Sequence, residues 1–233
     1  MLRLENVQSG YGTVQVLRGV SLRVPAGSAV ALLGANGAGK TTLLRTAAGV
    51  IQPTNGHIWF DGIAVEREPY HRRAQRGLCL IPEGRGIFRD LTVRENIAMF
   101  SGDTMKTSDA VDLAVDAFPA LKARLGQPAG QLSGGQQQML AVTRALLPET
   151  KVILADELSV GLAPVIIDEI FDVVSSLKAT GRSLLIVEQY VDRVLEVADY
   201  VYILHKGQVV FVGEPEQCLK TEIFDQYVGA AHS

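Results

Sequence analysis

Short apolar runs alternate with helical patterns along much of the chain. Ser28–Leu33, Val152–Ala155 and Leu184–Val187 are almost continuously apolar, as expected of strands buried on both faces of a sheet. Residues 40–48 follow the first run and predict a helix. Residues 164–179 carry apolar side chains at helical spacing and begin with a proline, which suits a first helical turn. This order predicts an α/β fold with a mainly parallel central sheet.

Two regions depart from that alternation. Residues 1–30 and Gly56–Phe60 alternate apolar and polar positions between glycine turns, which predicts antiparallel hairpins. Residues 88–147 contain almost no strand pattern, and we expect helices at Thr92–Phe100, Ser108–Leu125 and Gly134–Leu147. We therefore expect one domain over residues 1–233, with a core of about 1–87 and 148–233 and a helical subdomain of about 88–147.

Composition excludes several classes of protein. The chain has 233 residues, and its 22 basic and 25 acidic residues give a net charge of -3, which argues against a nucleic-acid partner. No apolar run approaches the ~20 residues that a membrane span needs, and the N-terminus lacks a signal peptide's apolar segment. Two cysteines, Cys79 and Cys218, are too few for a disulfide scaffold, so we expect buried thiols. These features predict a soluble globular protein.

A glycine-rich sequence follows the first apolar run and matches the phosphate-binding pattern GxxxxGK[ST]. A match arises by chance with a probability of roughly 0.007, and here it lies between a predicted strand and helix. Glycines let backbone N–H groups converge on phosphate oxygens, and the helix adds its positive N-terminal end. We expect Lys40 to neutralise phosphates and Thr41 to offer a hydroxyl to Mg²⁺. The predicted nucleotide-binding residues are Gly34, Ala35, Asn36, Gly37, Ala38, Gly39, Lys40, Thr41 and Thr42.

Two carboxylates follow the apolar run at 152–155. Alone, such a pair is usually a solvated loop or a helix cap. Downstream of a phosphate-binding loop, however, Asp156 is placed to reach Mg²⁺, and Glu157 is placed to polarise an attacking water. We therefore predict that Asp156 is a metal ligand and that Glu157 is the general base.

The sequence Leu-Ser-Gly-Gly-Gln is the most specific motif in the chain. It comprises Leu132, Ser133, Gly134, Gly135 and Gln136. This pentapeptide is the signature of the ATP-binding cassette (ABC) proteins, and the chain resembles an ABC transporter ATPase subunit over essentially its whole length. The resemblance implies a RecA-like P-loop NTPase core, an N-terminal antiparallel β subdomain and an inserted helical subdomain that carries the signature.

The resemblance also implies roles for other parts of the chain. In the family, the signature faces the ATP bound to a second ATPase subunit in a head-to-tail dimer. Tyr11 resembles the aromatic residue that stacks on adenine, and residues 159–162 resemble the loop that crosses between the two sites. Leu158 stands where the family commonly has proline after the catalytic glutamate, so we expect a locally looser backbone there.

Two further departures occur at positions that contact the nucleotide in this family. Glu83 stands where most members have a glutamine, and it can still contact Mg²⁺ or position water. Gln189 stands where most members have a histidine, and it can donate an amide hydrogen bond to the γ-phosphate. Both residues are expected to assist catalysis.

These departures, together with Gly161-Leu-Ala-Pro164, resemble the LivF-type ATPases of branched-chain amino acid importers and their urea and short-amide relatives. The resemblance implies an ATP- and Mg²⁺-dependent subunit at the cytoplasmic face of the inner membrane. Its expected partners are a second ATPase (an identical or a related chain), two permeases and, indirectly, a solute-binding protein. A urea or amide importer, a lipopolysaccharide exporter and a non-transport ABC ATPase are the alternatives.

None of these roles involves the basic cluster at His71–Arg76. The simpler interpretation is a solvated helix face. Contact with a permease loop or with acidic lipid is the alternative.

Overall fold

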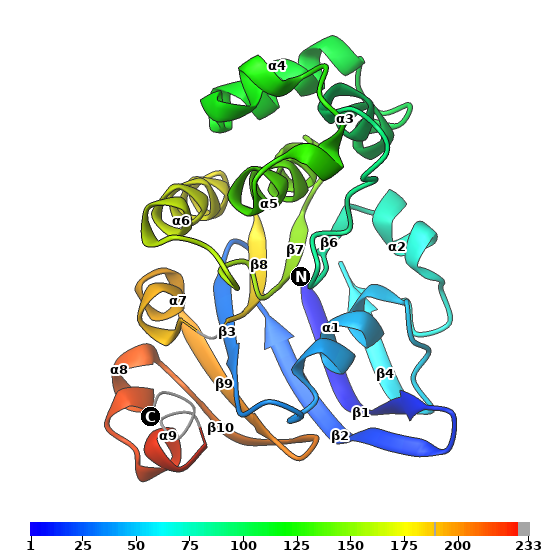
Figure 1. Cartoon of the computed structure of the whole chain (residues 1–233). Coiled ribbons are helices and arrows are strands. Elements are labelled where there is room, and N and C mark those ends of the chain that lie inside the picture. Colours follow the sequence, from blue (N-terminus) through cyan, green and yellow to red (C-terminus); the bar gives the residue numbers. More distant parts are fainter. Residues whose placement is uncertain (189, 228–233) are drawn as a thin grey trace.

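The chain forms two sheets with helices between and around them (Figure 1). The structure is a computed structural model that describes residues 1–188 and 190–227, with the side chains of residues 225 and 227 left out. The first sheet is antiparallel, in the order β2-β1-β4-β5. Its strands are β1 (Leu2–Tyr11), β2 (Val14–Val24), β4 (Asn55–Phe60) and β5 (Ile63–Ala64). The predicted N-terminal antiparallel β subdomain is confirmed.

The second sheet has the order β10-β9-β3-β8-β7-β6 and is parallel except for the β9–β10 pair. Its strands are β3 (Ala29–Leu33), β6 (Leu78–Ile81), β7 (Val152–Asp156), β8 (Ser183–Val187), β9 (Tyr200–His205) and β10 (Gln208–Gly213). In β3, Val30 and Leu32 pack toward one apolar cluster, and Ala29, Ala31 and Leu33 pack toward another. Burial on both faces explains the continuous apolar runs of these strands.

Helices cover the two faces of the parallel sheet. Helix α1 (Lys40–Ala48) and the antiparallel sheet share one cluster, while α5 (Gly134–Val142), α6 (Pro164–Ala179) and α7 (Val191–Val197) share the other. The remaining helices of this part of the chain are α2 (Tyr70–Gln75), α8 (Pro215–Leu219) and α9 (Glu222–Tyr227). None of the helices within the described residues has the length and apolar character that a membrane crossing requires.

The helical insertion lies at one end of the molecule (Figure 1). It contains α3 (Val93–Ser101), α4 (Thr107–Ala117), η1 (Pro119–Arg124), η2 (Ala129–Gln131), α5 (Gly134–Val142) and η3 (Thr143–Leu146). Apolar residues of these helices form a third cluster, which includes Val93, Ile97, Val111 and Leu140. That separate cluster supports our proposal that residues 88–147 form a subdomain.

One predicted helix, Ser108–Leu125, is two elements in the structure. Helix α4 ends at Ala117, and a 3-10 helix begins at Pro119. Proline disfavours helical backbone at the preceding residue, and Phe118 accordingly has φ -133° and ψ 83°. The apolar pattern continues across this break because Phe118 and Leu121 are both buried.

The basic cluster at His71–Arg76 is not a uniformly solvated face. Arg73 is fully buried and donates hydrogen bonds to the carbonyl oxygens of Thr46, Ala47, Glu66 and Glu68. Two of these carbonyls lie in the last turn of α1, whose negative end favours a cation. The interpretation as a solvated face is therefore wrong for Arg73. It holds for His71 and Arg72, which are exposed.

Candidate functional site

The phosphate-binding loop connects β3 to α1 and makes a close turn at each end. Gly34 has φ +145°, and a Cβ there would lie 2.2 Å from the carbonyl oxygen of Leu204, so only glycine fits. Gly39 is the N-cap residue of α1 with φ +108°, and its carbonyl accepts the first helical hydrogen bond from Leu43. The N-terminal end of α1 therefore faces the space beside the loop.

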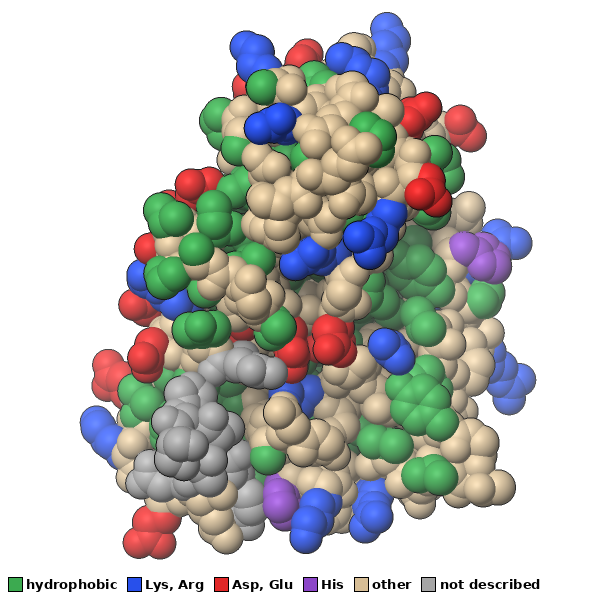
Figure 2. All heavy atoms as spheres, in the orientation of Figure 1, with side chains coloured by type: hydrophobic (Ala, Val, Ile, Leu, Met, Phe, Trp, Pro, Cys, Tyr) green, Lys and Arg blue, Asp and Glu red, His purple; other side chains and the backbone are tan. Residues whose placement is uncertain are grey.

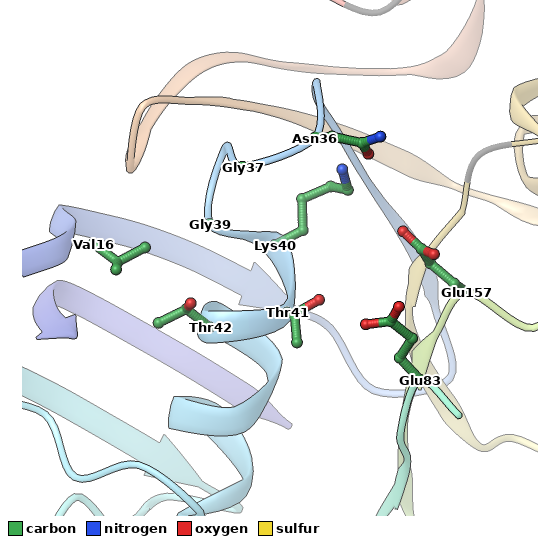
Figure 3. A pocket seen from close by; sticks show the side chains of 9 residues that line it. All are labelled: Val16, Asn36, Gly37, Gly39, Lys40, Thr41, Thr42, Glu83 and Glu157. Carbon is green, nitrogen blue, oxygen red and sulfur yellow. The ribbon is translucent and has the colours of Figure 1, made fainter. Parts of the chain in front are cut away.

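That space is a pocket of about 450 Å³ (Figure 3). It is lined by Val16, Asn36, Gly37, Gly39, Lys40, Thr41, Thr42, Glu83 and Glu157. The pocket thus brings together the loop, the start of α1 and the predicted carboxylates Glu83 and Glu157. Figure 3 shows Lys40 and Thr41 on the side of α1 that faces these two carboxylates.

Lys40 is the buried cation of the pocket. Its Nζ donates to the carbonyl oxygens of Gly34 at 2.6 Å and Ala35 at 3.2 Å, and the residue is 7% exposed. Burial lowers the pKa of Lys40, while the nearby carboxylates of Glu157 and Asp156 act in the opposite direction. A buried ammonium beside the phosphate-binding loop is suited to bind phosphate oxygens.

Asp156 ends strand β7 and lies beside α1. The hydroxyl of Thr41 donates to Asp156 Oδ1 at 3.2 Å, so Thr41 and Asp156, two of the three predicted metal ligands, are in direct contact. Burial raises the pKa of Asp156 to about 6, with Glu157 and Glu83 adding to the rise and the Thr41 hydrogen bond opposing it. A buried carboxylate next to a hydroxyl is a hard oxygen pair, and this chemistry fits Mg²⁺.

Among the described residues, no three carboxylate, imidazole or thiol groups converge as a self-contained metal site. Mg²⁺ is commonly held by one or two protein oxygens together with substrate phosphates and water. Thr41 and Asp156 supply two such oxygens side by side.

Glu157 follows β7 in a constrained backbone conformation. Its φ is +53°, which is uncommon for a residue with a side chain, and its N–H donates to the carbonyl oxygen of Val187 at 2.9 Å. Glu83 reaches the same pocket from the loop that follows β6. Parallel strands present their carboxyl ends at one edge of the sheet, which explains why residues distant in sequence meet here.

The loop after Glu157 is held in place, contrary to the looser backbone expected from Leu158. Leu158 and Ser159 are each 1% exposed. Ser159 donates from both its backbone N–H and its hydroxyl to the carboxylate of Glu188. Burial and these two hydrogen bonds hold the loop.

The signature residues lie outside this pocket, at the N-terminus of α5. Ser133 is the N-cap, its hydroxyl accepts from the Gln136 N–H, and the Gln136 side chain accepts from the Ser133 N–H. This reciprocal cap fixes the first turn of α5. None of the five signature residues lines the pocket of its own chain. Their predicted action on a second subunit stays a proposal.

Several predicted site residues do not line the pocket: Tyr11, Gly34, Ala35, Ala38 and Asp156, besides the signature residues. Tyr11 is exposed at the end of β1, and its hydroxyl accepts from Arg45 at 3.5 Å, so its adenine contact stays a prediction. Val16 lines the pocket instead and was not predicted, because a valine in an alternating strand carries no functional signal. Gln189 lies outside the described residues.

Together, the RecA-like sheet, the phosphate-binding loop and the inserted helices with their signature define an ATP-binding cassette. The ABC transporter family matches residues 17–160, and the chain belongs to this family. Solved structures agree with this assignment. A nucleotide-free cassette from an ABC transporter superposes with a TM-score of 0.83 at 27% identity, covering 100% of this chain and 98% of the other. The ADP conformation of the cassette MJ1267 gives a TM-score of 0.81 at 27% identity and the same coverage.

Several relatives match nearly the full length of the chain. The branched-chain amino acid transport ATP-binding protein BraG of Pseudomonas aeruginosa is 40% identical over 98% of this chain and 100% of its own length. The probable branched-chain amino acid transport protein LivF of Archaeoglobus fulgidus is 36% identical over 97% of each chain. The lipopolysaccharide export protein LptB of Haemophilus influenzae is 33% identical over 95% and 94%, respectively.

Proposed function

We propose that the chain is the ATP-hydrolysing subunit of an importer for branched-chain or other hydrophobic amino acids. The observation that carries this proposal is the near-complete match to the two branched-chain amino acid transport proteins at 40% and 36% identity. The lipopolysaccharide export relative is less similar at 33%. Glu83 also favours import over lipopolysaccharide export, since an ATPase of lipopolysaccharide export is expected to keep glutamine at this position.

The pocket accounts for ATP binding. The backbone N–H groups of residues 34–39 and the N-terminus of α1 surround the phosphates, and Lys40 neutralises their charge. Release of Lys40 from the Gly34 and Ala35 carbonyls frees its donors for phosphate oxygens. Thr41 and Asp156 hold Mg²⁺, which, when bound, offsets the charge that develops on the transferred phosphoryl group.

Hydrolysis requires a base beside the γ-phosphate. Glu157 lies across the pocket from Lys40, and we assign it to accept a proton from the attacking water. Glu83 contacts the metal site or orients the water, and Gln189 donates to the γ-phosphate. The fixed backbone at Glu157 holds the base in one place.

The active assembly is a head-to-tail pair of ATPase subunits. The capped N-terminus of α5, with Ser133 and the two glycines, presents backbone donors and a positive helix end to the nucleotide of the other subunit. The partner is a related ATPase or a second copy of the chain.

A groove between the core and the helical insertion offers a docking place for a permease loop at the cytoplasmic face of the membrane. Its volume is about 280 Å³, and its lining includes Tyr70, Phe88, Met99, Phe100 and Glu149. Figure 2 shows hydrophobic side chains gathered in the hollow between α2 and the insertion. Phe88, Met99 and Tyr70 are exposed, so the groove offers an apolar surface for the permease loop to cover.

The test is affinity purification of the tagged chain from detergent-solubilised membranes of its source, with ATP present. We expect a related ATPase and two hydrophobic permeases, and we expect amino acid uptake when these are reconstituted with their solute-binding protein. Met99→Asp should release the permeases, whereas Leu113→Asp, on an exposed position of α4 outside the groove, should not. Recovery of lipopolysaccharide transport components, or of no membrane protein despite intact ATPase activity, would contradict the proposal.

A further inference from the structure

Glu188 is a buried carboxylate to which the proposed mechanism gives no role. It follows the last residue of β8 and is 3% exposed. Its Oε1 accepts from the Ser159 backbone N–H at 3.1 Å, and its Oε2 accepts from the Ser159 hydroxyl. Two hydrogen bonds from a single serine to one buried carboxylate hold that serine in place.

Ser159 belongs to the segment that carries the catalytic base. Glu157 is bonded through its N–H to the Val187 carbonyl, and two residues later Ser159 is bonded to Glu188. The intervening Leu158 is buried in the apolar cluster beneath α6 and α7. The segment after β7 is therefore attached to the end of β8 on both sides of Leu158.

We propose that Glu188 is a positioning residue for hydrolysis and that it fixes Glu157 through Ser159. Glu157 adopts a left-handed backbone conformation, which persists only where the surroundings hold it. Without the second attachment, the backbone at Glu157 relaxes and its carboxylate moves away from the attacking water. This inference rests on the proposed function, because it takes Glu157 as the general base.

The structure supplies a matched control at the other end of the same strand. Ser183 is fully buried, and its hydroxyl accepts a hydrogen bond from the Gly27 N–H at 2.9 Å. Ser183→Ala, within β8, and Ser159→Ala, in the segment bonded to the end of β8, remove the same group from buried positions. Both variants lose a buried hydroxyl. A difference in their turnover therefore reflects where each serine lies relative to Glu157.

The experiment compares Glu188→Gln, Ser159→Ala and Ser183→Ala in the transporter assembled with its permeases and second ATPase. A misplacement of about 1 Å costs on the order of 10²-fold in rate, so we expect Glu188→Gln to lower kcat by about 10- to 100-fold. Ser159→Ala retains one attachment and should lower kcat less. Both should leave the KM for ATP within about twofold of the Ser183→Ala value.

A double-variant cycle tests whether Glu188 acts through Glu157. In a Glu157→Gln background, Glu188→Gln should change the remaining turnover by less than about twofold, because there is no base left to misplace. An equal fold-loss in both backgrounds would overturn the inference, and so would a normal kcat in Glu188→Gln. If Glu188→Gln fails to fold, the same cycle with Ser159→Ala decides the matter. Near-normal turnover of Glu157→Gln alone would instead refute the proposed function.

Discussion

The pocket depends on a few side chains whose contacts can be changed singly. Lys40 contacts two carbonyl oxygens of the phosphate-binding loop, Thr41 contacts Asp156, and Glu157 lies across from them. In each case, the local backbone is fixed by a glycine turn or by a strand end. Substitutions at these residues should therefore change chemistry more than folding.

Lys40→Ala should weaken ATP binding. The variant loses a charge-assisted hydrogen bond worth about 1.5–3 kcal/mol, so the Kd should rise roughly 10- to 100-fold. Titration with a fluorescent ATP analogue measures this change. Lys151→Ala, an exposed lysine paired with Asp61, is the control and should leave the Kd unchanged. Equal affinities of the two variants for ATP would mean that the phosphates do not bind beside Lys40.

Glu157→Gln should separate binding from hydrolysis. Loss of the general base should lower turnover by roughly 10²–10⁴-fold, while the amide leaves the pocket's shape and its ATP affinity intact. Phosphate release and nucleotide binding, measured on one preparation, check both parts. A variant with nearly normal turnover would exclude Glu157 as the base.

Neither cysteine should react with thiol reagents in the folded chain. Burial raises the pKa of Cys79 to about 12 and that of Cys218 to about 11, so less than about 1% of either is thiolate at pH 8. Mass spectrometry after alkylation should find both thiols unmodified, and denaturant should expose both. Rapid labelling of the native chain would contradict the burial described above.

At the scale of elements, α1 is fixed at both ends. Its N-terminus begins at the phosphate-binding loop, and its C-terminal carbonyls accept hydrogen bonds from Arg73. Burial lowers the pKa of Arg73 to about 10, which leaves it cationic at neutral pH. The attachment at one end of α1 thus supports the geometry of the pocket at the other.

Arg73→Ala should therefore destabilise the fold. Four carbonyl oxygens lose the hydrogen bond from Arg73, and we expect a loss of about 2–5 kcal/mol in the free energy of unfolding. Denaturant unfolding measures this loss. Arg72→Ala, on the exposed side of the same helix, should change the free energy of unfolding by less than about 0.5 kcal/mol. Similar effects of the two substitutions would mean that the buried bonds contribute little.

The sequence predicted many of these elements because local pattern determines them. The strands near 28–33, 152–155 and 184–187 and the helices at 40–48 and 164–179 agree with the structure to within a residue. Long-range contacts cannot be predicted from local sequence pattern in the same way. The burial of Arg73, the place of Val16 in the pocket and the contact of Ser159 with Glu188 each depend on how distant segments pack.

At the scale of the whole molecule, the phosphate-binding pocket and the signature are separate surfaces of one chain. The pocket is lined by residues of the phosphate-binding loop and by the start of α1, but none of the signature residues lines it. We therefore expect a single chain to bind ATP but a second subunit to be needed for hydrolysis.

Gly134→Asp should test this separation. The added carboxylate should repel the γ-phosphate of the other subunit and lower turnover at least about tenfold, since like charges in contact cost several kcal/mol. A Cβ at Gly134 lies 3.1 Å from the flexible end of Arg85, so the fold should tolerate it. Gly126→Asp adds the same group where no atom lies within 4 Å and should leave turnover unchanged. Loss of ATP binding by the isolated Gly134→Asp chain would contradict the separation.

The placement of the signature outside its own pocket has a consequence for the cell. In the proposed head-to-tail pair with a related ATPase, a subunit made before its partners, or in excess of them, would have no second signature opposite its pocket. We then expect unassembled copies to hold ATP without consuming it. Subunit synthesis could in that case run ahead of membrane insertion without a futile drain on the energy supply.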